Sequence, residues 1–227
     1  MPRLGKPCLP ILISAEGAVT QVKDLLAKNN WKEEETKIEK PALVFLPFWF
    51  FHFDSFREEI DPESQEKTTT EGDRGTAALD AISGDIDDAV PPLFDNYSDQ
   101  LTTKSAVEHY KIERSHFRDT EVQKLAQLRM AAKLSIPKDD VVISGVRLVY
   151  LPVWIVSAVF EDNEMDFEIE AVEGALVSEE EVPFKGHTAS ELARETLFDL
   201  RTPAKWVSYA MGLIKSIIDF LWNNPLT

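Results

Sequence analysis

The sequence predicts an α+β fold made of two repeated helix-plus-antiparallel-sheet units with pseudo-twofold symmetry and a C-terminal helical extension. The first observation is a repeat, because the apolar run Leu43–Phe50 returns as Leu148–Ile155, each with Leu-Pro-x-Trp at its centre. An offset of 105 residues holds without a gap from Gln21–Phe53 to Ala126–Ala158. The second observation is periodicity, since helical spacing precedes each run and strand-like alternation follows the second.

The repeat divides the chain into three parts. Residues 1–100 form the first repeat, with an N-terminal strand and a polar loop at 61–75. Residues 101–187 form the second repeat, and residues 188–227 form the helical extension. The chain has 227 residues, of which 44% are apolar, so it can bury a sizeable core in two closely packed halves.

The net charge of -16 is concentrated in two windows. Residues 54–100 carry 14 acidic and 3 basic side chains, and residues 161–181 carry 10 acidic side chains and no basic one. Such surfaces repel phosphate backbones, so nucleic acid is not an expected partner. The single cysteine, Cys8, excludes an internal disulfide and a cysteine-rich zinc site. The apolar run Cys8–Ile13 is too short for a signal peptide, and a cytoplasmic protein is expected.

The first repeat is expected to begin with a strand and a helix. The predicted elements are a strand at 8–13, a helix at Glu16–Lys28, a buried strand at Ala42–Phe53, the loop 61–75, a strand at Ala77–Ile82 and a connector at Asp87–Gln100. Pro47 has no N–H to donate to a sheet, so it predicts a bulge, a bend or a local edge in the buried strand.

The second repeat is expected to contain a helix at 104–118 and another that runs from Thr120 to Leu134. Thr120 and Gln123 have the spacing of a capping box. The predicted strands are Val146–Phe160 and the alternating stretch Asp166–Ala171, joined by a tight hairpin at 161–164.

Two helices are expected near the end of the sequence, at 190–200 and 204–222. The second is apolar over most of its circumference, so another surface must cover it. The candidates are the protein's own sheet, a partner or second subunit, and a membrane surface. The residues predicted to bind a partner are Trp206, Tyr209, Leu213, Ile217, Phe220 and Leu221.

The strand endings Asp80-Ala81-Ile82-Ser83-Gly84-Asp85-Ile86 and Glu170-Ala171-Val172-Glu173-Gly174-Ala175-Leu176 correspond between the repeats. This unit resembles the PepSY and cystatin-like modules, whose last strands often carry an Asp-Ala-x-x-Gly turn. The resemblance covers about 70–85 residues of each repeat. It implies binding or peptidase restraint rather than catalysis, and it assigns no role to a particular residue.

No stretch of the sequence has the pattern of a catalytic, cofactor-binding or metal-binding site. His52 lies near acidic residues, and Trp49 and Trp154 could line a ligand pocket between the repeats together with it. Core packing is the favoured interpretation of the tryptophans, and a structural role is favoured for the histidine. Cys8 is expected to be a small core residue.

These observations favour a non-catalytic scaffold that binds a protein or peptide, with a homodimer as one form of partnership. One alternative is a cytoplasmic module docked at a membrane by the 204–222 helix. Another is a small-molecule-binding or hydrolytic protein with a pocket between the repeats.

Overall fold

The computed structural model describes residues 3–60, 67–104, 108–160 and 163–177. In this part of the chain the fold is α+β, as predicted, with three α-helices and a nine-stranded, mostly antiparallel sheet. The helices are α1 (Ala15–Lys28), α2 (Val90–Tyr97) and α3 (Asp119–Leu134). The strands are β1 (Arg3–Cys8), β2 (Thr36–Ile38), β3 (Ala42–Ile60), β4 (Lys67–Asp80), β5 (Ile86–Asp87), β6 (Thr102–Lys104), β7 (Tyr110–Ile112), β8 (Val141–Phe160) and β9 (Asn163–Glu170).

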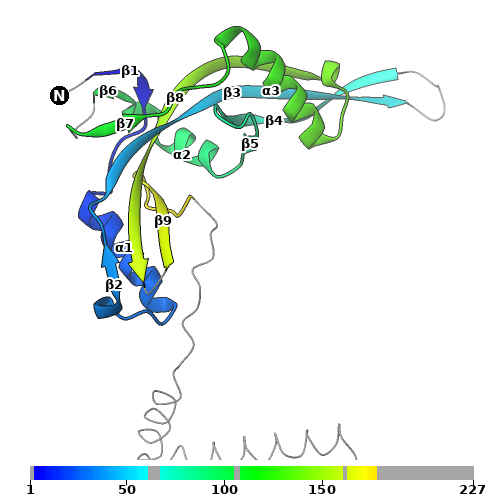
Figure 1. Cartoon of the computed structure of the whole chain (residues 1–227). Coiled ribbons are helices and arrows are strands. Elements are labelled where there is room, and N and C mark those ends of the chain that lie inside the picture. The colour runs from blue at the N-terminus through cyan, green and yellow to red at the C-terminus, as the bar shows by residue number, and fades with distance from the viewer. Residues whose placement is uncertain (1–2, 61–66, 105–107, 161–162, 178–227) are drawn as a thin grey trace, which may run out of the picture.

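Two long strands, β3 and β8, pair antiparallel at the centre of the sheet and bend together, so that the molecule has two arms (Figure 1). The α1 arm contains α1, β2, β9, the start of β3 and the end of β8. The α3 arm contains α3, β4, the end of β3 and the start of β8. Each arm therefore takes segments from both sides of residue 100, and the boundary between the predicted repeats is not a boundary in space.

In the β3–β8 ladder Leu46 pairs with Leu151, the residue 105 positions later, so this pair is the centre about which the two apolar runs match. On either side of this pair, Leu43 lies opposite Trp154 and Trp49 lies opposite Leu148. The two tryptophans thus occupy matching places at equal distances from the centre, one in each arm.

Both Leu-Pro prolines lie where the outer neighbour of their strand changes. Beside β3, β7 pairs as far as Phe45 and β4 pairs from Phe48, so Pro47 lies in the gap. Beside β8, β9 begins at Val153, immediately after Pro152. The N–H and C=O of one residue in a strand point to the same side, so the missing N–H of each proline faces this gap. The predicted local edge at Pro47 is confirmed.

The turns after β4 and β9 have the same geometry. Ala81 N–H donates to the carbonyl of Pro47 at 3.0 Å, and Ala171 N–H donates to that of Pro152 at 2.8 Å. The glycines that end the turns, Gly84 and Gly174, have φ values of 81° and 88°. Only glycine adopts this region without steric cost, which explains its place in both motifs.

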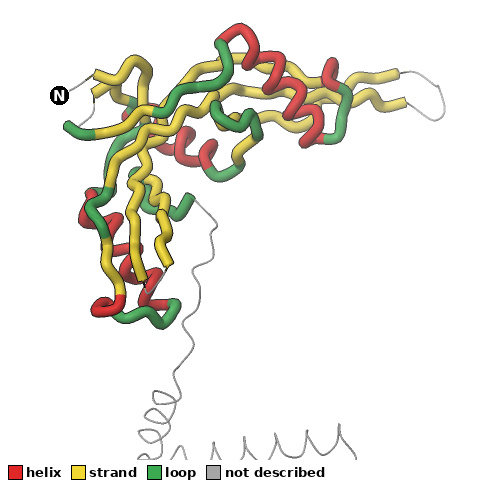
Figure 2. Tube along the Cα trace, viewed as in Figure 1, coloured by secondary structure: helices red, strands yellow, loops and turns green. Residues whose placement is uncertain are grey.

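The helices divide between the two faces of the sheet, with α1 and α3 on one face and α2 in the inner angle of the arms (Figure 2). Odd-numbered β3 residues such as Phe45 and Phe51 pack beneath α1 and α3, and even-numbered residues such as Phe50 pack against α2. Burial on both faces explains the continuous apolar run in β3. The buried face of α1 contains Ala18, Val22 and Leu26, as the helical spacing of 16–28 predicts.

The predicted loop at 61–75 is wrong over its second half. Residues 67–75 belong to β4 and pair with the end of β3, for example Thr70 with Arg57 and Thr76 with His52. Segment 67–75 has no apolar residue of its own, but its backbone pairs with β3 and its β-branched threonines favour a strand, so the absence of apolar residues did not indicate a loop. Residues 61–66 lie outside the described part.

Two further predictions between residues 87 and 118 are wrong. The connector Asp87–Gln100 contains α2, whose Pro91 and Pro92 stand in its first turn, where a missing N–H costs little. The expected helix at 104–118 is replaced in the described residues by β7 and irregular chain, because the Tyr110–Ile112 segment pairs parallel with β3.

Smaller corrections concern element ends. The strand expected at 8–13 is wrong except at Cys8, which is the last residue of β1, and residues 9–13 are irregular. The start of α3 is capped by Glu121, whose carboxylate accepts from Arg118 N–H at 3.1 Å, and Gln123 instead bonds the carbonyl of Ile143. Phe160 pairs with Asn163, and residues 161–162 of the predicted hairpin lie outside the described residues, as do the predicted helices 190–200 and 204–222.

Candidate binding groove

An open groove of about 920 Å³ lies on the α1 arm, between α1, the start of β3 and β7. Its lining is mostly apolar on the floor and charged at the rim. It consists of Ala15, Glu16, Val19, Thr20, Lys23, Lys40, Pro41, Ala42, Leu43, Val44, Glu108, His109, Tyr110, Lys111 and Trp154. These residues come from four segments far apart in the sequence, so the groove is a property of the folded arm.

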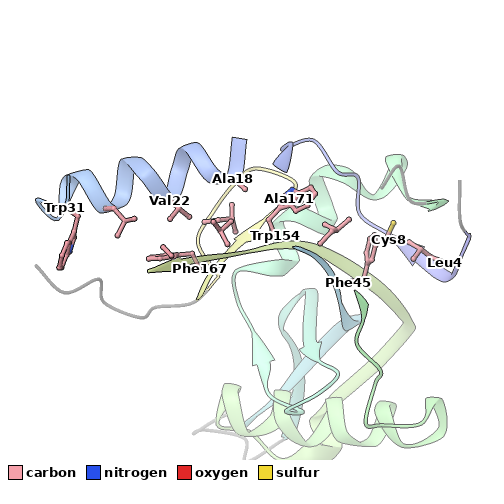
Figure 3. Close-up of a cluster of buried hydrophobic side chains, with 14 residues drawn as sticks. Leu4, Cys8, Ala18, Val22, Trp31, Phe45, Trp154, Phe167 and Ala171 are labelled. Carbon is pink, nitrogen blue, oxygen red and sulfur yellow. The ribbon is translucent and has the colours of Figure 1, made fainter. Parts of the chain in front are cut away.

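The floor of the groove is fixed by Trp154. Its ring is 4% exposed, and its indole N–H donates to the carbonyl of Ile13 at 2.9 Å. Ile13 immediately precedes Ser14, whose hydroxyl caps α1 by accepting from Gly17 N–H at 3.1 Å. The tryptophan therefore ties the start of α1 to β8. Figure 3 shows the ring in the buried cluster of the α1 arm, which also contains Ala18 of α1 and Phe167 of β9.

The groove is open because two features that close the α3 arm are missing from the α1 arm. In the α3 arm, Gln123 donates to the carbonyl of Ile143 at 3.1 Å. Gln127 donates to the carbonyl of Val141 at 2.8 Å. These bonds hold α3 down on β8. The buried faces of the two helices match at an offset of 104, with Ala18, Val22 and Leu26 in α1 and Val122, Ala126 and Met130 in α3. Val19 and Lys23 therefore stand on α1 where α3 has Gln123 and Gln127. Valine has no donor, and Lys23 instead forms an ion pair with Glu33.

The strand beneath the groove is also interrupted. β8 runs unbroken from Val141, but the corresponding stretch in the α1 arm is split into β2 and β3 by residues 39–41. Pro41 has no N–H for a ladder, and it lines the groove next to exposed Lys40 and Ala42. The groove therefore has partly exposed apolar side chains beside an interrupted strand, whereas β8 in the α3 arm is uninterrupted.

Charges gather at the rim, where three lysines and two glutamates stand. Lys23 and Lys111 are paired with acids outside the groove, Glu33 and Glu113 respectively. The hydrogen bond from Lys23 is the main cause that lowers the pKa of the exposed Glu33 carboxyl. The rim therefore carries charges of both signs around an apolar interior.

The structure separates the three residues predicted to share a pocket. Trp154 lines the groove, but Trp49 lies six positions further along the ladder, about 20 Å away, in the buried cluster of the α3 arm. Trp49 donates its indole N–H to Ser115 Oγ at 3.0 Å. His52 is exposed on β3, with Nδ1 3.4 Å from Thr76 Oγ1.

The six residues predicted to bind a partner, Trp206, Tyr209, Leu213, Ile217, Phe220 and Leu221, lie outside the described residues. Sequence reasoning missed the groove itself, including Val19, Pro41 and Tyr110. The sequence offset of 105 pairs Gln123 and Gln127 with Ala18 and Val22, so it gave no signal for Val19 and Lys23. The contribution of β7 had no signal, since 104–118 was expected to be a helix.

Within the described residues, no group of three or more histidine, cysteine, aspartate and glutamate side chains could hold a metal ion. No helix in that part of the chain is long and apolar enough to cross a membrane. Cys8 is buried at 1% exposure in the cluster of the α1 arm, as predicted for a core residue, and burial raises the pKa of its thiol to about 11.

No protein-family model, curated protein or solved structure matches this chain significantly.

Proposed function

We propose that this chain is a non-catalytic scaffold that binds a protein or peptide, and that the groove beside α1 receives an apolar segment of that partner. The observation that carries the proposal is the groove itself, where half-buried Val19, Pro41 and Tyr110 present apolar surface above the buried side chains of Leu43 and Trp154. An open groove with an apolar floor and a charged rim suits an amphipathic helix, which presents an apolar stripe and a polar outer face.

The proposal also includes the relation between the two halves of the chain. We take the two halves as copies of one PepSY-like or cystatin-like unit related by a pseudo-twofold axis through the Leu46–Leu151 pair. The matched tryptophans, prolines and glycine turns support this relation. On this proposal one copy keeps a closed helix, and the other opened its helix for binding. A cytoplasmic location, with a homodimer as one form of partner, completes the proposal.

The test is a photo-crosslinking amino acid placed at Thr20, which is exposed and lines the groove. The matched control carries the same amino acid at Leu128, which is 46% exposed on α3. In the native source, we expect crosslinks to an apolar segment of a partner from position 20 and not from position 128. Val19→Asp in the same chain should abolish them. The same products from both positions, or crosslinks that survive Val19→Asp, would contradict the proposal.

A small-molecule site is the second candidate, and the groove volume of about 920 Å³ favours it, since ligand pockets commonly measure about 300–1,000 Å³. The tests differ in the crosslinked product. Crosslinks from Thr20 to low-mass metabolites, with no peptide product, would favour the small-molecule function.

A further inference from the structure

We propose that residues 204–222 of this same chain occupy the groove in the free protein, so that an external partner must displace them. This inference rests on the proposed function only in using the same groove. The segment is outside the described residues. The argument therefore combines its sequence with the structure of the surface proposed to receive it.

The spacing of apolar residues in the segment fits the groove. A helix over 204–222 would place Tyr209, Leu213 and Ile217 on one stripe, about 12 Å from first to last. The groove follows α1 from Ala15 to Lys23, which is also about 12 Å. Three anchors along two helical turns are the pattern by which amphipathic helices lie in apolar grooves.

The place where the described chain ends favours this occupant. Val177 donates its N–H to the carbonyl of Glu168 at 2.7 Å, so the chain leaves alongside β9, within the α1 arm. The cluster that contains the β9 residue Phe167 also contains Val22 of α1 and Trp154 at the groove. The described chain therefore ends on the arm that carries the groove.

The chain between the described part and the segment is long enough to reach the groove and short enough to keep the segment near it. Residues 178–203 comprise 26 residues, which span about 86 Å when fully extended and about 28 Å on average when flexible. A tether of this length gives an effective concentration on the order of 1 mM. A second copy at micromolar concentration competes poorly with that value, so docking within one chain is favoured over exchange between chains.

Docking within the chain also resolves a conflict between the sequence and the structure. The segment 204–222 needs an apolar surface to cover it, and the groove is an apolar surface that the described residues leave open. If the segment lies in the groove, the apolar face of the segment and the apolar lining of the groove are both covered. The groove then becomes available only to partners that compete with the tethered segment.

The experiment is hydrogen exchange on the full chain, with two pairs of variants. Val19→Asp places a charge in the groove, and Leu12→Asp places the same charge at a residue that is 53% exposed and does not line it. Leu213→Asp changes a residue of the apolar stripe, and Ser216→Asp places the same charge at a polar residue of the same segment that is not on this stripe.

We expect the amides of 204–222 to exchange at least about tenfold more slowly than unstructured chain. This protection should disappear in Val19→Asp and Leu213→Asp and persist in Leu12→Asp and Ser216→Asp, in a protein with the mass of a monomer. Leu213→Asp leaves the groove residues unchanged, so it tests the contact even if Val19→Asp fails to fold.

Three results would overturn the inference: unprotected amides in the wild-type protein, protection that survives Leu213→Asp, or protection that appears only with a dimeric mass. The proposed function is judged separately. Groove-dependent crosslinks without protection of 204–222 would retain the function and reject self-docking, whereas protection without external crosslinks would do the reverse.

Discussion

Trp154 donates its indole N–H to the carbonyl oxygen of Ile13 over 2.9 Å, joining residues 141 positions apart in the sequence. The bond fixes the chain just before α1 onto the strand that forms the groove floor. Trp49, at the matching place in the other arm, donates instead to the hydroxyl of Ser115 at 3.0 Å. The indole of Trp154 therefore binds a backbone carbonyl, whereas the indole of Trp49 binds a side-chain hydroxyl.

Trp154→Phe should lower the free energy of unfolding by about 2 kcal/mol, because the Ile13 carbonyl loses its donor. Trp49→Phe is the matched control and should cost less. Ser115 Oγ still accepts from Phe117 N–H at 3.2 Å and donates to the Phe117 carbonyl at 2.9 Å after the indole is removed. Urea unfolding should show a larger fall in midpoint for Trp154→Phe at an unchanged m value. Equal losses would contradict the different roles assigned to the two rings.

The core strands and α1 could be predicted because their patterns are local. Apolar residues in Ala42–Phe53 are continuous, and those in Glu16–Lys28 recur at helical spacing. α2 could not be predicted, because Pro91 and Pro92 resemble chain breakers although a first helical turn accepts them. The β4 segment 67–75 was missed because its order comes from the ladder with β3, not from apolar side chains.

The candidate site was only partly predictable for a related reason. Trp154 was a pocket candidate, but His52 and Trp49 were assigned to the same pocket and lie elsewhere. Sequence periodicity shows which face of an element is apolar. It does not show that α1 packs against β8 while β7 pairs alongside the start of β3. That packing brings Tyr110 and Val19 to one groove.

Gly84→Ala should destabilise the protein by about 2–4 kcal/mol. Its φ of 81° costs an alanine about 1–2 kcal/mol, and the new Cβ would lie 2.8 Å from Cζ of Phe117 in the packed cluster of the α3 arm. Gly174→Ala has a similar φ of 88°, but its Cβ would meet the flexible amide of Gln21, so the loss should be nearer about 1–2 kcal/mol.

Gly5→Ala provides the control for both turns, because no heavy atom lies within 4 Å of the added Cβ. Thermal or urea unfolding should rank the variants as Gly84→Ala, then Gly174→Ala, then Gly5→Ala, from most to least destabilised. A Gly84→Ala protein as stable as the wild type would show that the turn after β4 differs from the one described.

Glu170→Gln should cost more stability than Asp80→Asn, although the two carboxylates stand at matching turns. Glu170 is 2% exposed, and its oxygens accept from Val172, Glu173 and Ala175 N–H groups at 2.7–3.0 Å. An amide presents one acceptor oxygen and turns its NH₂ toward donors, so a loss of about 2–3 kcal/mol is expected.

For Asp80, both bonds, from Ile82 N–H at 2.6 Å and Ser83 N–H at 3.3 Å, reach the same oxygen, Oδ1. Asparagine retains that oxygen, so Asp80→Asn should cost about 1 kcal/mol or less. Urea midpoints of the two variants measure the difference directly. The opposite ranking would mean that the buried carboxylate is not held by the turn after β9.

Cys8 should make the native state less stable as the pH rises from 9 to 11. Burial raises the pKa of the folded thiol from 9.0 to about 11, so the unfolded chain loses its proton first. The stability from the neutral thiol is fully present below pH 9 and is lost as the pH rises toward 11. Burial also raises the pKa of Tyr150, so the wild type alone does not isolate the effect.

The difference between the wild type and Cys8→Ala isolates the thiol, because Tyr150 is common to both proteins. Cys8→Ala should be less stable at pH 8, since it leaves a small void in the cluster of the α1 arm. The difference in unfolding free energy between the wild type and Cys8→Ala should shrink between pH 9 and 11, because only the wild type loses the stability that the neutral thiol contributes. Urea unfolding at several pH values measures this difference, and a disadvantage independent of pH would contradict the buried neutral thiol. At pH 8 the folded protein should also resist a thiol reagent that reacts readily after unfolding.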